Sequence, residues 1–225
     1  MYRPLAVFAL LALLPISAGA RAQTAADVYE AIDLKVKDVL SGTSLGAKVL
    51  PGADKQLVSL TTYMTGKQDR SNAVNVRLDV LQPTSKGLEI VYTRDFGSEQ
   101  GGFVGEGNLE LFDLDMDGTS EIIVSYRSYA DPGIEQQIGE VIVHEEGKFR
   151  TAWTGPLTYD ATGASGDIPV ERRDHFVREV DLAGTLRTRG VTLFITKRVV
   201  AVAGESLPEP KTVRETFPLR IRKGW

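Results

Sequence analysis

The hydrophobic period of the chain changes near residue 42. Before that point, one apolar stripe recurs at three- or four-residue spacing, formed by Val28, Ile32, Val36 and Val39/Leu40. This spacing predicts an amphipathic α-helix over residues 25–40. Thr24 or Asp27 is suited to its N-cap, and Ser41-Gly42 is suited to its end. We expect the apolar stripe to pack on the protein's own sheet.

After Gly42 the apolar residues alternate with polar ones, which is typical of half-buried strands. The alternation or β-branched character predicts strands near residues 58–64, 76–80, 88–92, 109–112, 122–129, 138–145, 149–153, 191–202 and 212–221. Residues 83–87 form a turn signal that joins two of these strands in a hairpin, and Pro208 and Pro210 mark another turn. Pro218 places the last strand at an edge or at a break.

This pattern predicts a mainly β fold of antiparallel sheets, either a β-sandwich or an incomplete propeller-like stack, with one short N-terminal α-helix. Regular alternation of strands and helices is absent from the sequence, so a doubly wound parallel sheet is not expected. Residues 23–225 are long enough for a single β-rich domain with its own core.

Residues 1–22 are set apart from this fold. Arg3 precedes a ten-residue apolar run from Leu5 to Leu14, and Ala20 and Ala22 supply small residues at a cleavage site. A charged start, a short apolar run and a small-residue site in this order predict a signal peptide. The apolar run is shorter than the roughly 20 residues that a membrane-spanning helix needs. We therefore expect export, to the periplasm or outside the cell, and no membrane span after cleavage.

Composition and charge narrow the possible functions. The chain has no Cys and two His, which excludes disulfides, thiolate metal sites and cysteine nucleophiles. A formal net charge of −4 gives no reason to expect nucleic-acid binding. The charge is uneven: residues 23–170 carry 12 basic and 23 acidic side chains, whereas residues 171–225 carry 12 basic and 7 acidic. We interpret the two parts as solvated or mutually attracting faces of one domain.

One motif carries identifiable chemistry, the acidic run that begins at Asp113. Counted from that residue, carboxylates occupy positions 1, 3, 5 and 9, Gly occupies position 6, and a backbone carbonyl is available at position 7. Four like charges so close together repel one another unless a cation neutralises them. Oxygen donors in variable geometry suit calcium better than magnesium. The predicted ligands of a structural calcium ion are Asp113, Asp115, Asp117, Thr119 and Glu121.

The loop departs from an EF-hand, because position 12 is Val124 rather than Glu and the flanking residues predict strands rather than helices. An acidic loop of the form Asp-x-Asp-x-Asp-Gly-x-x-Glu between strands resembles the calcium-binding β-hairpin of FG-GAP and VCBS-type repeats, which are blades of integrin-like propellers. The resemblance covers residues 107–155 and occurs once. It implies one blade-like sheet and a bound calcium ion, rather than a closed seven-bladed ring.

Other candidate sites have weaker support in the sequence. His144 and His175 lie in polar surroundings typical of exposed residues. Residues 42–46 match Gly-x-Ser-x-Gly, but they follow the predicted helix, whereas a nucleophile elbow follows a strand, so we expect a flexible loop. Asp160 and Asp167 could form a second weak cation site, but we expect a plain loop there. Trp153 and Tyr159 could stack on a sugar, but we expect them to pack in the core.

The sequence therefore favours an exported, calcium-stabilised β-domain that acts in binding or interaction, with an unidentified protein or glycan partner and no evident catalytic residues. The alternative is a periplasmic or secreted hydrolase acting on a glycan or a peptide, which would need an acid and a base flanking the scissile bond. A third possibility is an assembly factor whose acidic part docks on a basic partner.

Overall fold

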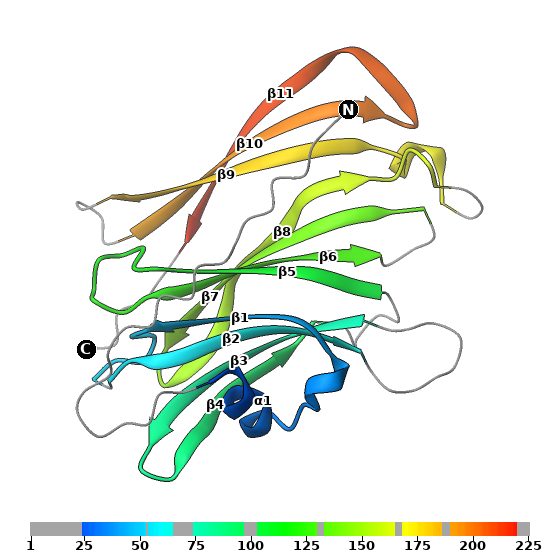
Figure 1. Ribbon diagram of the computed structural model, residues 1–225. Helices are drawn as coiled ribbons and strands as arrows, with labels where there is room; N and C mark the ends of the chain where they lie inside the picture. The colour runs from blue at the N-terminus through cyan, green and yellow to red at the C-terminus, as the bar shows by residue number, and fades with distance from the viewer. Residues whose placement is uncertain are drawn as a thin grey trace.

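A computed structural model describes residues 24–52, 54–64, 74–96, 103–129, 133–164, 168–185 and 190–219. The predicted signal peptide, residues 1–22, lies outside the described residues. Within them, the chain forms one α-helix, two short 3₁₀ turns and eleven strands that follow one another antiparallel (Figure 1). The strands are β1 (Val39–Ala47), β2 (Gln56–Met64), β3 (Val74–Thr84), β4 (Gly87–Asp95), β5 (Phe103–Phe112), β6 (Glu121–Tyr129), β7 (Glu135–Glu145), β8 (Lys148–Asp160), β9 (His175–Thr185), β10 (Gly190–Val202) and β11 (Glu205–Leu219). The fold is mainly β with one short helix, as the sequence predicts.

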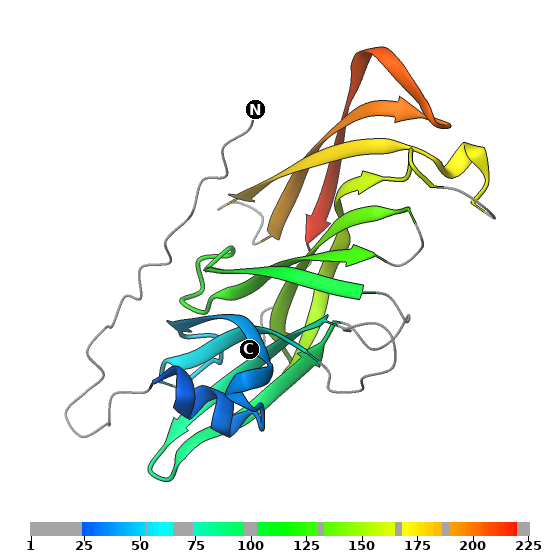
Figure 2. The same ribbon diagram turned by 45° about the vertical axis from the view of Figure 1, so that its right-hand side comes forward.

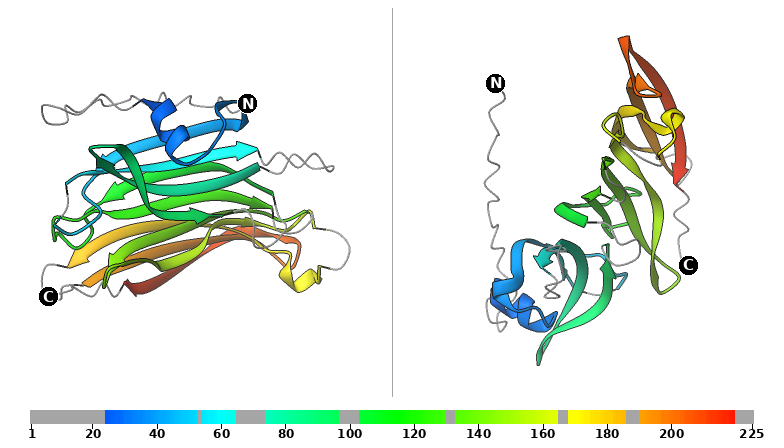
Figure 3. Two further views of the ribbon diagram at one scale, coloured as in Figure 1. Left: turned by 90° about the horizontal axis from the view of Figure 1, so that it is seen from below. Right: turned by 90° about the vertical axis from the view of Figure 1, so that its right-hand side faces the viewer.

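The strands form two sheets. One has the order β1-β2-β3-β4, and the other runs from β5 to β11 in sequence order. The larger sheet is held together weakly between β8 and β9, where, among the described residues, only Thr158–Asp160 pair with His175–Val177. The larger sheet curls into a half-barrel. The strands of the chain therefore lie in three groups, one beyond the next (Figure 3, right): β1–β4, β5–β8 and β9–β11.

The first core lies between the first and second strand groups. Period-two alternation in β2 and β3 turns their apolar residues toward the second group, where alternate residues of β6 and β7 meet them. The buried members include Val58, Leu60, Val76, Leu78, Val124 and Ile142. Gly107 of β5 lies at the closest approach, because a Cβ at this position would stand 2.7 Å from Leu60 Cδ2. A side chain is therefore excluded where β5 crosses β2 and β3.

The second core lies between the second and third groups. Since neighbouring residues of a strand face opposite sides, β6 and β7 contribute to both cores. Ile122 and Ile142 belong to the first core, whereas Ile123, Val141 and Val143 belong to the second. The second core is completed by Leu114, Trp153, Leu193, Ile195 and Leu219. The second strand group is thus covered on both faces.

The helix α1 (Ala25–Ala31) covers the outer face of the first group, which Figures 1 and 2 both show. Thr24, one of the two N-cap candidates in the sequence, is the N-cap, and Asp27 completes a capping box with it. Val28 and Ile32 pack on Leu81 of β3, and Arg77 of β3 donates to the Ile32 carbonyl at 3.1 Å. Among the described residues, no helix is long and apolar enough to cross a membrane.

The prediction of a helix over residues 25–40 is wrong beyond Ala31. The helix ends where Asp33 takes a left-handed conformation (φ 56°) and Leu34 N–H bonds to the Tyr29 carbonyl. Residues Val36–Asp38 form a 3₁₀ turn, and β1 begins at Val39. The last part of the predicted apolar stripe pairs with β2 instead, because β-branched residues suit a strand and the β2 edge offers backbone partners.

Three further local predictions need correction. The Gly-x-Ser-x-Gly segment is part of strand β1 rather than a flexible loop, and Ser44 pairs with Ser59 of β2. Strand β9 has no counterpart among the predicted strands. Pro208 and Pro210 lie within β11, while the turn falls at Ala203 and Gly204. These prolines are tolerated because β11 is the edge of its sheet, which also confirms the edge position predicted from Pro218.

Candidate metal centre

The acidic loop connects β5 to β6 at one end of the second strand group. Its two ends are held by the sheet, because Phe112 and Glu121 are register partners across the two strands. The segment predicted to resemble a single repeat, residues 107–155, falls on strands β5 to β8. The loop therefore lies between two paired antiparallel strands, as the flanking apolar runs predict.

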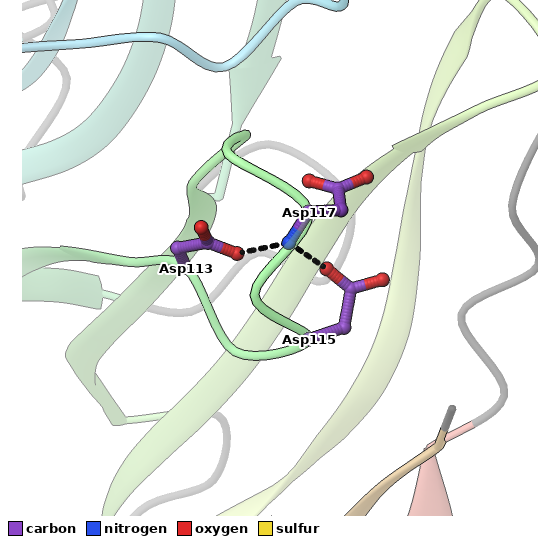
Figure 4. A group of neighbouring side chains, drawn as sticks. All are labelled: Asp113, Asp115 and Asp117. Atoms are coloured by element: carbon purple, nitrogen blue, oxygen red, sulfur yellow. Dashed lines mark hydrogen bonds between the residues drawn. The ribbon is translucent and has the colours of Figure 1, made fainter. Parts of the chain in front are cut away.

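The structure brings three of the predicted ligands together. One carboxylate oxygen from each of Asp113, Asp115 and Asp117 lies within 4.8 Å of the other two. In Figure 4 the carboxylates of Asp113 and Asp115 converge on the backbone N–H of Asp117. Among the described residues, these three form the group of His, Cys, Asp and Glu side chains that could together hold a metal ion.

Backbone N–H groups of the loop hold these carboxylates in place. Asp117 N–H donates to Asp113 Oδ1 at 3.0 Å and to Asp115 Oδ1 at 3.2 Å. Gly118 N–H donates to Asp113 Oδ2 at 2.8 Å, and Thr119 N–H donates to Asp117 Oδ1 at 2.8 Å. Each carboxylate oxygen can accept more than one bond, so these contacts orient the three side chains and leave acceptor capacity.

The turn of the loop depends on two left-handed residues. Met116 has φ 59° and Gly118 has φ 85°. Glycine adopts this conformation without steric cost, which explains why it occupies the sixth position. Met116 adopts it at a cost of about 1 kcal/mol, and the residue is 67% exposed. The backbone reversal that gathers the carboxylates is thus partly strained.

Glu121 lies apart from the three aspartates, although the sequence predicts it as a ligand. Its side chain is buried, and one carboxylate oxygen accepts from Leu114 N–H at 2.7 Å. Burial raises the pKa of Glu121 to about 7, and the charges of Asp115, Asp117 and Asp113 add to this, while the Leu114 bond opposes it. Glu121 therefore closes the base of the loop in this structure. Ligation by Glu121 and by the Thr119 carbonyl stays a prediction.

The loop is also fixed to its surroundings. Leu114 is buried in the second core, and Ser120 N–H donates to the Lys48 carbonyl, which follows β1, at 2.7 Å. The acidic loop consequently bonds to the first strand group through its backbone and takes part in the second core through the Leu114 side chain. No sequence signal predicts the contact with Lys48, because every residue carries a backbone carbonyl.

The chemistry of the cluster follows from its donors. Three negative carboxylates are held close together, with oxygen atoms as the ligand atoms on offer. A hard cation that accepts six to eight oxygen ligands in variable geometry fits such a set, and calcium is such a cation. Soft metals prefer thiolate and imidazole ligands, and the chain has no Cys. The donor set therefore fits calcium.

The remaining candidates have structural roles. His144 lies at the end of β7 against the Phe149 ring, and burial lowers its pKa. His175 Nδ1 lies 3.2 Å from Asp160 Oδ2, which ties β9 to the end of β8. Trp153 is buried in the second core, as the sequence predicts, and Tyr159 stacks on Phe176. Asp167, the predicted partner of Asp160 in a second cation site, lies outside the described residues.

Comparison of the whole chain with protein-family models, with curated proteins and with solved structures gives no match.

Proposed function

We propose that the loop from Asp113 to Glu121 binds a calcium ion, and that the ion stabilises an exported β-domain whose role is binding rather than catalysis. The proposal rests on one observation, the convergence of the Asp113, Asp115 and Asp117 carboxylates within 4.8 Å of one another. Like charges at this separation repel, so the loop is a place where a cation gains binding energy and the fold gains stability.

A structural role follows from where the loop is attached. The ion would hold a loop that is also attached to the fold at two other points. Leu114 lies in the second core, and Ser120 N–H donates to the Lys48 carbonyl. A ligand that binds only the folded state at one hundred times its Kd adds about 2.7 kcal/mol to the free energy of unfolding. Such a contribution suits a chain that has no Cys and hence no disulfides.

Export is supported by the sequence. The pattern of residues 1–22 predicts a signal peptide, and calcium is available outside the cytosol at the millimolar level that loops of modest affinity require. A hydrolase stays the alternative. It would need an acid and a base on either side of a scissile bond. A bound cation would keep the clustered aspartates ionised and would use their oxygens as ligands, so they are poorly suited to act as that acid and base.

Calorimetry of the purified protein tests the proposal. Calcium should raise the melting temperature and EDTA should reverse the rise, with magnesium giving a smaller response. Asp115→Asn combined with Asp117→Asn should abolish the calcium response, while stability in EDTA stays equal or increases because repulsion is relieved. A control with Glu205→Gln and Glu209→Gln removes two exposed charges from β11 and should respond to calcium like the unmodified protein. An unmodified protein with no calcium response would overturn the proposal.

A further inference from the structure

Strand β1 is an edge of the four-stranded sheet, and it has an open outer side. It pairs with β2 on one side, and within the described residues its backbone bonds to no other element (Figure 1). Gly42 and Gly46 are both exposed, and because glycine has no side chain, the exposed surface at these positions is backbone. The N–H and C=O groups along such an edge are a template for pairing with another strand.

The other sheet edges carry residues that discourage such pairing, and β1 carries none of them. Prolines and charged side chains in an edge strand oppose the approach of a second strand. Edge strand β11 has three prolines, and β4 and β5 both have charged residues: Pro208, Pro210 and Pro218 in β11, Glu89, Arg94 and Asp95 in β4, and Glu106 and Glu110 in β5. From Val39 to Ala47, β1 has neither a charged residue nor a proline. Its one irregularity lies between Val39 and Ser41, so the edge is regular from Ser41 to Ala47.

A second copy of the chain supplies a strand that matches this edge. Two-fold symmetry, which is the commonest symmetry of homodimers, places β1 antiparallel to β1 of the copy. Ser44 is the middle residue of the regular part of β1, so a fully overlapping pair sets it opposite Ser44 of the copy. Gly42 then lies opposite Gly46, and Thr43 lies opposite Leu45. No pair opposes like charges or two large side chains, and the two serine hydroxyls can bond to each other.

We propose that two copies of the chain associate through their β1 strands, so that two four-stranded sheets join into one continuous sheet. Main-chain hydrogen bonds provide the attraction, because alternate residue pairs of an antiparallel ladder exchange two bonds. A contact limited to Ser41–Ala47 is small, so the dimer is weak and its population depends on protein concentration. The paired residues lie outside the acidic loop, and the association therefore does not require calcium.

Sedimentation of the purified protein in EDTA tests the association. The average mass should rise from that of a monomer toward that of a dimer between about 1 μM and about 1 mM protein, the range in which a small interface associates. Amide hydrogen exchange should slow in β1 over the same range and stay unchanged in edge strand β11. A monomer at every concentration, or a dimer that leaves exchange in β1 unchanged, overturns the proposal.

Charges introduced at the centre of β1 test which strand forms the contact. Ser44→Lys sets two like charges opposite each other and should weaken dimerisation about fivefold, and Ser44→Asp should do the same. A mixture of the two variants should recover the dimer, because opposite charges then face each other, and this recovery also shows that both variants are folded. Ser206→Lys, at an exposed position of edge strand β11, is the matched control and should leave dimerisation unchanged. A dimer that Ser44→Lys does not weaken, or a mixture that associates no better than either variant alone, would exclude the β1 contact.

Discussion

Arg94 of β4 and Glu140 of β7 form an ion pair between the first and second strand groups, with Arg94 Nη2 lying 3.0 Å from Glu140 Oε2. Tyr126 donates to Glu140 at 3.1 Å, and Thr151 also bonds to the carboxylate. The Glu140 carboxylate is buried, whereas about a third of the Arg94 side chain is exposed. Burial raises the pKa of Glu140, and the Arg94 charge opposes that rise. A charged link thus joins the first and second strand groups beside the first core.

Removing Arg94 should lower the free energy of unfolding more than removing Glu140. Arg94→Met leaves a buried carboxylate with hydroxyl partners alone, so we expect it to lower the free energy of unfolding by about 3 kcal/mol. Glu140→Leu leaves a guanidinium that can turn to water, so the loss should be about 1 kcal/mol. Urea denaturation of both variants and the double variant measures the coupling. A double variant equal to the sum of the two losses would show that the pair is not coupled.

The pKa of Glu121 predicts a pH dependence of stability in the absence of metal. The folded pKa is about 7, above the ordinary value of 4.5, so the folded state binds more protons between these values. Lowering the pH from 8 to 5.5 in EDTA should therefore stabilise the protein, with Glu121 contributing about 2 kcal/mol. The contribution is fully present below the unfolded pKa and is lost as the pH rises through 7.

Glu121→Gln isolates this contribution, because the amide oxygen can still accept from Leu114 N–H and does not titrate. The difference in free energy of unfolding between the protein and this variant should change with pH in the stated direction. A difference that is constant from pH 5.5 to 8 would contradict the raised pKa.

Gly118→Ala tests the backbone of the acidic loop. A Cβ at Gly118 would meet no atom within 4 Å, but its φ of 85° is unfavourable for any other residue. We expect a loss of about 1 kcal/mol together with weaker calcium binding, because the strained loop gathers the carboxylates less often. Gly163→Ala is the control, since a Cβ there is also free of contacts and its φ is not left-handed. Similar losses in both variants would mean that the conformation of Gly118 is unimportant.

Gly107→Ala tests the close approach of β5 to the first sheet. The added Cβ would lie 2.7 Å from Leu60 Cδ2 and 3.1 Å from Val76 Cγ1, so the core must shift at a cost of about 2 kcal/mol. Adding Leu60→Val should recover part of this loss by making room. Gly46→Ala in the β1 edge meets only the Gln56 carbonyl, at 4.0 Å, and should be nearly neutral. Thermal denaturation compares the three variants, and a neutral Gly107→Ala would contradict the close packing.

The elements that can be predicted from the sequence are those whose pattern lies within a few neighbouring residues. Alternation in β3, β6 and β7 reports a strand whose alternate residues are buried, and the turn before Gly87 lies where the sequence places it. The gathering of Asp113, Asp115 and Asp117 is also local, because a loop with Gly118 at the reversal brings alternate side chains together. The helix beyond Ala31 was mispredicted, because its spacing was helical while pairing with β2 decided its structure.

By itself, the sequence determined the mainly β character, the start of the helix near Thr24 and the presence of an acidic loop between two strands, since each depends on interactions within a few residues. Only the tertiary structure decided that Glu121 bonds to Leu114, that Lys48 holds the loop at Ser120, and that β1 lies at the edge of its sheet. These relationships depend on strand register and on packing between distant segments. The burial and charge that they create cannot be read from the order of residues along the chain.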